Sequence, residues 1–178
     1  NKFKVFSFRF ATACGMSSRL RLDLVLNDFV TNAILFKEIN ILSDGSSWRP
    51  LISVKDICRA IIWATNIDLD KINENFLCIN TGSDDWNYKV IDIAKVVSRV
   101  IGPISIKVGP RKSKDKRSYK VDFSKFTKLA KEKKIDKTLD STIIELFEGI
   151  KKIKFNDKNF RNSDFIRLNV LRKFLQKQ

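Results

Sequence analysis

The sequence predicts an α/β protein, because patterns typical of strands and helices alternate along its 178 residues. Apolar residues at every second position mark strands, and apolar residues three and four apart mark helices with one buried face. With 43% hydrophobic residues, a chain of this length can bury a core without disulfide or metal cross-links. The length corresponds to about one domain of roughly 150 residues.

The first half of the chain predicts a strand, a helix, a short strand and a second helix. Lys4–Phe10 has aromatic residues at every second position, as a buried strand does. After a glycine-containing turn, Asp23 can cap a helix. Ile39–Leu42 is a short strand, and Ser53 begins a capping box for the next helix. The buried faces of the two helices are expected to contain Leu26, Phe29, Val30 and Ala33, and then Ile57, Ala60, Ile61 and Ala64.

The second half continues the alternation. Further strands are expected at Phe76–Ile79, Pro103–Val108 and Tyr119–Val121. Further helices are expected with a cap at Asn87, with a cap at Asp122 or Ser124, at about Ser141–Ile153, and from Ser163 onward. Their apolar faces are expected to contain Val90, Ile93, Ala94, Val97 and Ile101, then Phe126, Leu129 and Ala130, then Ile143, Ile144, Phe147 and Ile150, and finally Ile166, Leu168, Leu171 and Leu175.

Composition excludes several kinds of site within this chain. Three separated cysteines, Cys14, Cys58 and Cys78, lie in apolar runs, so we interpret them as small core residues of a protein from the cytoplasm, a reducing compartment. The chain has no histidine and therefore no Ser–His–Asp triad or histidine-bound zinc. It contains no glycine-rich phosphate loop and no Tyr-x-x-x-Lys pair. No apolar run approaches the roughly 20 residues of a membrane span, so a membrane is not an expected partner.

The net charge of +15 is concentrated in the second half. Residues 1–100 carry 13 Lys and Arg against 11 Asp and Glu, whereas residues 101–178 carry 22 against 9. Such a surplus suits nucleic acid or phosphorylated ligands. Most of it is lysine interleaved with acidic residues in helical stretches such as Lys125–Lys137, which favours a solvated face over a nucleic-acid surface.

Two arginines are candidates for phosphate binding. Arg49 lies between a polar loop and a strand–helix junction, and Arg117 lies between a basic loop and a predicted strand. A guanidinium group at the end of a strand suits bidentate binding of phosphate oxygens. The alternative is that both are surface residues paired with Asp44 and Asp115.

Five segments, in order, resemble motifs of the NAD-dependent epimerase/dehydratase family of extended short-chain dehydrogenases, which act on nucleotide sugars. The segments are Arg9–Gly15, Arg21–Asp28, Asp44–Asp56, Phe76–Gly82 and Arg117–Lys125. The resemblance implies the C-terminal portion of an NAD(P)-binding Rossmann-like fold. Residues 1–18 would end the Rossmann-like core, residues 19–153 would form the substrate-binding part with returning core elements, and residues 154–178 would be a linker and an amphipathic helix.

The resemblance also implies roles for five residues. Arg49 and Arg117 would hold the diphosphate of a nucleotide sugar, and Asn27 would hydrogen-bond a phosphate or the sugar. Leu42 would flank the nucleotide base. Thr12 would lie close to both the sugar and the nicotinamide of the cofactor. Thr12 stands where the best-studied epimerases have Asn, so the resemblance does not carry over the sugar specificity.

The catalytic parts of that family lie outside these residues. NAD or NADP would be bound mainly by a glycine-rich unit upstream, and a Tyr–Lys pair there would transfer the proton. The chain begins with Asn inside an apolar strand, which we interpret as the sign of a longer parent protein. A homodimer is one of the oligomeric states left open for that parent.

Two alternatives remain. The first is a basic module that binds nucleic acid or another polyanion, centred on Lys107–Lys137. The second is a family member that has lost activity.

Overall fold

The computed structural model describes residues 3–68, 70, 72–110, 117–130 and 136–176, and it has the α/β architecture that the sequence predicts. The strands are β1 (Val5–Phe10), β2 (Thr12–Cys14), β3 (Glu38–Ile41), β4 (Trp48–Ser53), β5 (Phe76–Thr81), β6 (Asn87–Lys89) and β7 (Ser105–Val108). The helices are α1 (Val25–Phe36), α2 (Val54–Asn66), α3 (Val90–Ile101), α4 (Ser124–Leu129), α5 (Leu139–Lys152) and α6 (Arg167–Leu175). Two 3-10 turns are η2 (Asp84–Trp86) and η3 (Phe160–Asn162). No described helix is long and apolar enough to cross a membrane.

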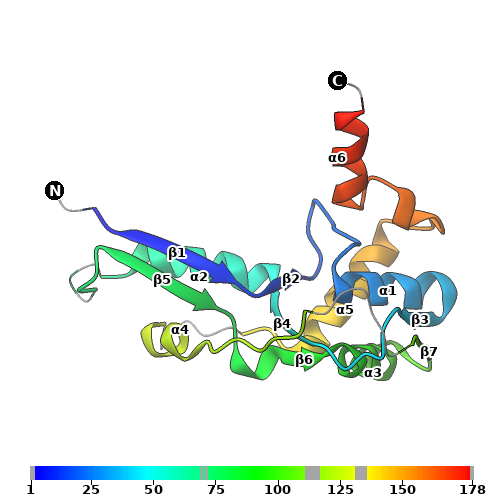
Figure 1. Ribbon diagram of the computed structural model, residues 1–178, viewed down its shortest axis with the longest axis horizontal. Helices are drawn as coiled ribbons and strands as arrows, with labels where there is room; N and C mark the ends of the chain where they lie inside the picture. The colour runs from blue at the N-terminus through cyan, green and yellow to red at the C-terminus, as the bar shows by residue number, and fades with distance from the viewer. Residues whose placement is uncertain (1–2, 69, 71, 111–116, 131–135, 177–178) are drawn as a thin grey trace.

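One end of the molecule is a parallel pair of strands, β1 and β5, covered by α2 and α4 (Figure 1). The alternation predicted for β1 turns Phe6, Phe8 and Phe10 to one face of this pair. There the Trp63 ring of α2 makes edge contacts with Phe6 at 6.2 Å and with Phe126 of α4 at 5.5 Å between ring centroids. These aromatic contacts hold the two helices on the strands.

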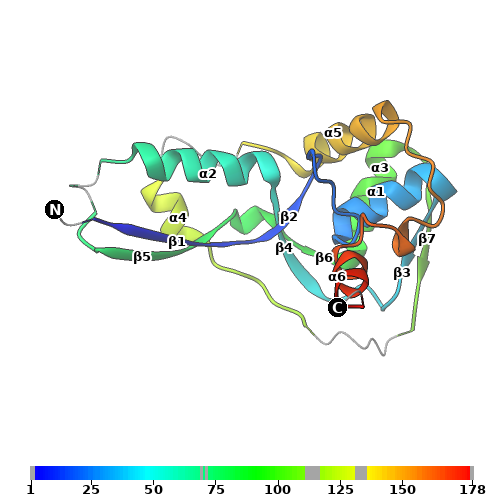
Figure 2. The same ribbon diagram turned by 90° about the horizontal axis from the view of Figure 1, so that it is seen from above.

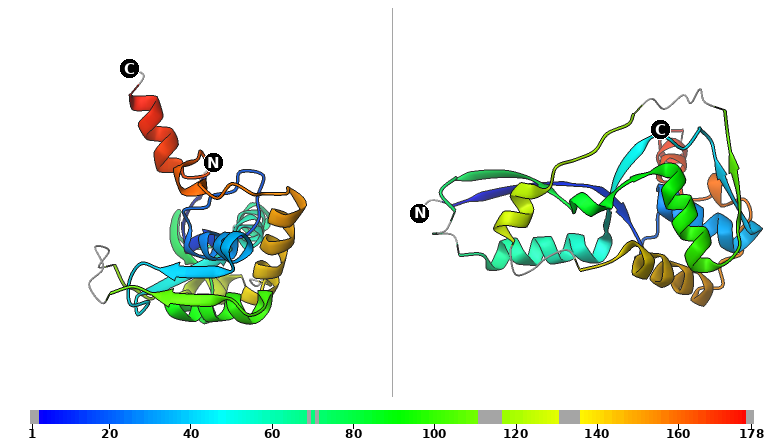
Figure 3. Two further views of the ribbon diagram at one scale, coloured as in Figure 1. Left: turned by 90° about the vertical axis from the view of Figure 1, so that its right-hand side faces the viewer. Right: turned by 90° about the horizontal axis from the view of Figure 1, so that it is seen from below.

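The other end holds the larger core. Here β4 pairs in parallel with β2 and antiparallel with β6, while β3 pairs in parallel with β7. Helices α1, α3 and α5 gather beside these strands (Figure 2). Their buried faces supply much of one hydrophobic cluster, which includes Leu26, Val30, Ile93, Val97, Ile143, Leu146 and Ile150. Helix α6 projects away from this end (Figure 3).

Helix α2 has the predicted Ser53 cap, but the Asp56 carboxylate accepts a 3.2 Å hydrogen bond from the Ser53 hydroxyl rather than completing the predicted capping box. The Ser53 hydroxyl accepts a hydrogen bond from the backbone N–H of Asp56 at 3.1 Å. The buried Asp56 carboxylate in turn accepts a 2.6 Å hydrogen bond from Arg59 and backbone hydrogen bonds from Asp136 and Lys137. The start of α2 is therefore tied to the segment that leads into α5.

Two predicted caps and one predicted strand are wrong. Helix α1 follows Leu24 rather than Asp23, and neither α1 nor α3 has a side-chain cap. Asn87 is part of β6. Residues 119–121 are not a strand, because one backbone hydrogen bond, from the Tyr119 N–H to the Trp48 carbonyl of β4 at 3.4 Å, and the Asn87 side chain at Val121 take the place of a strand ladder.

Several predicted core residues are also exposed. Ile61 and Ile144 face solvent, whereas Trp63 and Leu146 are buried on the same helices. In α6, Leu168, Leu171 and Leu175 are exposed, and this helix has no buried residue. A short window of apolar residues fits more than one helix face, and only the packing partner selects which face is buried.

The three cysteines also differ from one another. Cys14 is buried, as predicted, and burial raises the pKa of its thiol to about 12. Cys78 is half-buried, and Cys58 is exposed on α2, so the prediction of a core position is wrong for Cys58.

Candidate functional site

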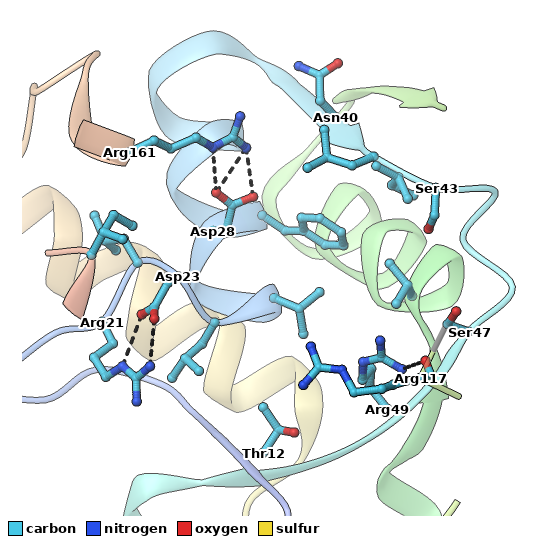
Figure 4. A pocket seen from close by; sticks show the side chains of 18 of the residues that line it. Thr12, Arg21, Asp23, Asp28, Asn40, Ser43, Ser47, Arg49, Arg117 and Arg161 are labelled. Atoms are coloured by element: carbon cyan, nitrogen blue, oxygen red, sulfur yellow. Dashed lines mark hydrogen bonds and ion pairs between the residues drawn. The ribbon is translucent and has the colours of Figure 1, made fainter. Parts of the chain in front are cut away.

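A cavity of about 1020 Å³ lies where α1, β3 and β4 meet two irregular segments, one carrying Arg117 and Tyr119 and the other carrying Arg161 and Ile166 (Figure 4). Its polar lining consists of Thr12, Arg21, Asp23, Asp28, Asn40, Ser43, Ser47, Arg49, Arg117, Tyr119 and Arg161. Apolar lining comes mainly from the first turn of α1 and from the end of β3. The cavity is thus an apolar hollow with convergent charged groups, as small-molecule sites commonly are.

Four of the five residues singled out by the sequence line this cavity: Thr12, Leu42, Arg49 and Arg117. Arg49 and Arg117 are 68 positions apart, and Nη1 of Arg49 donates a hydrogen bond to the backbone carbonyl of Arg117. The same nitrogen donates to the Trp48 carbonyl at 2.8 Å. The Arg49 guanidinium also lies 6.0 Å from the Tyr119 ring centroid. The two arginines therefore share one wall of the cavity.

Residues 117–123, which we name the strap, lie beside β4 and β6. The Ser118 hydroxyl accepts a hydrogen bond from the Trp48 N–H at 3.1 Å. The Asn87 amide accepts from the Val121 N–H at 2.9 Å and donates to the Val121 carbonyl at 3.0 Å. The Asp84 carboxylate accepts from the Phe123 N–H at 3.0 Å. These side-chain contacts, with one backbone hydrogen bond from the Tyr119 N–H to the Trp48 carbonyl at 3.4 Å, take the place of the predicted strand and hold Arg117 and Tyr119 at the cavity.

Asn27 lies outside the cavity lining. Its side chain is buried, accepting a hydrogen bond from the Gly15 N–H at 2.9 Å and donating one to the Arg21 carbonyl at 2.8 Å. Leu24, one turn earlier at the start of α1, lines the cavity instead. The Asn27 amide connects the loop after β2 to α1, and this loop leads to the cavity residue Arg21.

Two ion pairs in the cavity wall have no counterpart among the sequence predictions. Arg21 donates to Asp23 at 2.6 and 3.1 Å, and this hydrogen bonding lowers the pKa of Asp23. Arg161 donates to Asp28 across 133 positions, at 3.0 to 3.2 Å. Burial raises the pKa of Asp28, and the nearby Arg161 opposes that shift. The pairing of Arg161 is a long-range contact, so no local motif marks it.

The predicted basic module is described only in part. Lys112, Lys114 and Lys116 lie outside the described residues. Lys89 and Lys120 have their ammonium nitrogens 5.4 and 3.8 Å from the ring centroid of Trp48. Within the described part of the chain, no group of His, Cys, Asp and Glu residues could hold a metal ion.

Comparison with known proteins gives one family match. Residues 1–77 match the model of the NAD dependent epimerase/dehydratase family. The matched residues include β1, β2 and α1, together with Arg49 on β4.

Solved structures of similar fold have low sequence identity to this chain. One is a UDP-glucose 4-epimerase from Bifidobacterium longum in complex with NAD+ and UDP, with TM-score 0.64, 19% identity, and coverage of 85% of this chain and 48% of that one. Another is a UDP-glucuronic acid 4-epimerase from Bacillus cereus, with TM-score 0.64 and 20% identity. The match covers 82% of this chain and 45% of that one. A third is a dTDP-glucose 4,6-dehydratase from Bacillus anthracis, with TM-score 0.66 and 18% identity. The match covers 83% of this chain and 45% of that one. This chain therefore spans slightly less than half the length of these structures, and it shares their α/β fold over that part.

Proposed function

We propose that this chain, whose residues 1–77 match the model of the NAD dependent epimerase/dehydratase family, is a member of that family and the substrate-binding half of an enzyme acting on nucleotide sugars. The reaction proposed for the whole enzyme is hydride transfer to and from NAD at a sugar carbon, in an epimerisation or a dehydration. The division at residues 18 and 153 into core end, substrate-binding part and C-terminal segment belongs to the same proposal.

The observation that carries the proposal is the presence of Arg49 and Arg117 in one wall of the cavity. The described lining holds four arginines and two aspartates, a formal surplus of two positive charges. A diphosphate carries the complementary negative charge, and planar guanidinium groups match the spacing of its oxygens. Each charge-assisted hydrogen bond contributes about 1.5–3 kcal/mol, so the pair suffices to anchor a diphosphate.

The other predicted residues take complementary roles in this proposal. Leu42, directly after β3 and 81% exposed, would lie against the nucleotide base. Thr12, at the start of β2, would contact the sugar and the nicotinamide. Asn27 would act indirectly, because its buried amide fixes the loop that leads to Arg21.

The described residues do not fit NAD as its main binding site. A dinucleotide site needs a glycine-rich turn at a helix N-terminus, where backbone N–H groups face the pyrophosphate. At the β4–α2 junction the corresponding turn holds no glycine; it holds Ser53, which caps α2, and the buried side chain of Asp56. We propose that NAD, which accepts and returns a hydride when bound, is held mainly by residues outside this chain, with Thr12 as a contact.

The test is binding of UDP to the chain, measured by calorimetry. Wild type should bind UDP, and Arg49→Gln and Arg117→Gln should each weaken binding about tenfold or more, since each removes charged hydrogen bonds. Arg19→Gln, an exposed residue outside the described lining, is the matched control and should bind as wild type does. The chain alone should not reduce NAD in the presence of UDP-sugars. Absence of UDP binding, or an equal loss in all three variants, would overturn the proposal.

A further inference from the structure

Arg161 presents a guanidinium group to the cavity in a fixed orientation. Its Nε and Nη2 atoms face the Asp28 carboxylate, with three hydrogen bonds between 3.0 and 3.2 Å. A guanidinium group has five N–H donors, and those of Nη1 lie on its other edge. The side chain is 47% exposed while Asp28 is 19% exposed, so the carboxylate holds the inner edge of a group whose outer parts reach the cavity.

The segment that carries Arg161 is itself anchored in the protein. Phe155 packs against Phe160 and Phe165, with ring centroids 6.3 and 5.2 Å apart. Phe160 is only 1% exposed. The Asn169 amide donates to the Arg161 carbonyl at 2.9 Å. Both the backbone and the side-chain end of Arg161 are therefore held, so a ligand that contacts it need not order a loose loop.

The position of Arg161 relative to the other cavity residues separates it from the diphosphate clamp. Figure 4 shows Arg161 and Asn40 on one side of the cavity, with Arg49 and Thr12 on the other. In the proposed function, Arg49 holds the diphosphate and Thr12 lies by the sugar. The remaining portion of a nucleotide sugar, its nucleoside, then extends toward Asn40 and Arg161.

We propose that Arg161, oriented by Asp28, is a specificity-determining residue that donates a hydrogen bond to a ring carbonyl of the nucleobase. This inference rests on the proposed function. The ligands selected are nucleoside diphosphates whose base carries a carbonyl oxygen, such as UDP. Adenine has no carbonyl oxygen, and its acceptors are ring nitrogens at positions that differ from those of the uracil carbonyl oxygens, so ADP should bind less tightly.

The experiment measures binding of UDP, ADP and inorganic pyrophosphate to the wild-type chain and to Arg161→Gln, Arg161→Lys and Arg172→Gln. Wild type should bind UDP about tenfold more tightly than ADP, which is the difference that one charged hydrogen bond makes. In Arg161→Gln, UDP affinity should fall about tenfold, while the affinities for ADP and pyrophosphate change less than about twofold. Arg161→Lys should lose most of the preference for UDP, because an ammonium group cannot bind Asp28 in the same forked geometry. Arg172, an exposed residue of α6 outside the described lining, is the matched control and should leave all three affinities unchanged.

Circular dichroism of each variant separates loss of folding from loss of recognition, and Arg161→Lys retains the charge and the aliphatic stem if Arg161→Gln does not fold. An unchanged ratio of UDP to ADP affinity in the folded Arg161 variants would overturn the inference while leaving the diphosphate proposal intact. Equal losses for UDP and pyrophosphate would also overturn it, since Arg161 would then act on phosphate. If wild type binds neither UDP nor pyrophosphate, the proposed function fails, and this inference fails with it.

Discussion

Asn87→Ala should weaken ligand binding even though Asn87 lies outside the described lining of the cavity. The Asn87 amide makes both hydrogen bonds to Val121, at 2.9 and 3.0 Å, and thereby holds the strap that carries Arg117. At about 0.5–1.5 kcal/mol each, the two bonds contribute about 1–3 kcal/mol to folding. The strap residues nearest Val121 then become less ordered in the variant.

A ligand that needs Arg117 must order those strap residues when it binds. Fixing the backbone of one residue costs about 1–2 kcal/mol, so the loss of order around Val121 corresponds to about a tenfold drop in UDP affinity. Urea unfolding measures the effect on stability, and calorimetry measures the effect on UDP binding. Asn66→Ala is the control, because among the described residues the Asn66 amide bonds within α2, to the Ile62 carbonyl and to the neighbouring Thr65 hydroxyl.

A double-mutant cycle distinguishes positioning from a general loss of stability. If Asn87 acts through Arg117, then Asn87→Ala should cost little further affinity in an Arg117→Gln background. Additive losses in the double variant would refute the reasoning. So would wild-type UDP affinity in a folded Asn87→Ala protein.

Three further predictions concern stability. Asp56→Ala should lower the free energy of unfolding, measured by urea denaturation, by about 3–5 kcal/mol. The reason is that it removes a buried carboxylate that accepts hydrogen bonds from Arg59 and two backbone amides. A loss below about 1 kcal/mol would contradict this prediction. Gly82→Ala should lower the free energy of unfolding by about 1–3 kcal/mol, because the added Cβ would lie 2.6 Å from the ring of the buried Phe123. An unchanged melting temperature would show that the ring can move and would contradict this prediction. Because burial raises the pKa of Cys14 to about 12 from 9.0, its contribution to stability is complete below pH 9 and is lost as the pH rises toward 12. The free energy of unfolding should therefore fall with pH across that window more steeply in wild type than in Cys14→Ala, and parallel curves would contradict the buried-thiol assignment.

Local sequence patterns predicted a strand or a helix start correctly where a clear local signal marks it, such as alternating aromatic residues or a capping hydroxyl. The aromatic alternation of Lys4–Phe10 became β1, and the hydroxyl of Ser53 caps α2. The same reasoning failed for Ile61 and Ile144, which are exposed. A pattern of apolar residues shows that a helix has a buried face, but several neighbouring faces of a short helix are almost equally apolar.

The strap shows why the sequence alone misled at the site. Tyr119–Val121 has the composition of a strand, but its backbone binds the Asn87 side chain at Val121 and the Trp48 carbonyl at Tyr119, and it forms no strand ladder. Strand propensity reports a preference for extended backbone, which the strap does have. The identity of the hydrogen-bond partner is not encoded locally.

The six helices, the strands β1, β3, β5 and β7, the type of fold and the candidacy of the two arginines followed from the sequence, because propensity, periodicity and charge act between neighbouring residues, whereas β2, β4 and β6 were not predicted. The tertiary structure decided that Arg49 meets Arg117 across 68 positions and that Arg161 meets Asp28 across 133. It also placed Leu24 rather than Asn27 in the cavity wall. Such contacts depend on how separate elements pack together, and that packing is a property of the whole chain rather than of any single segment.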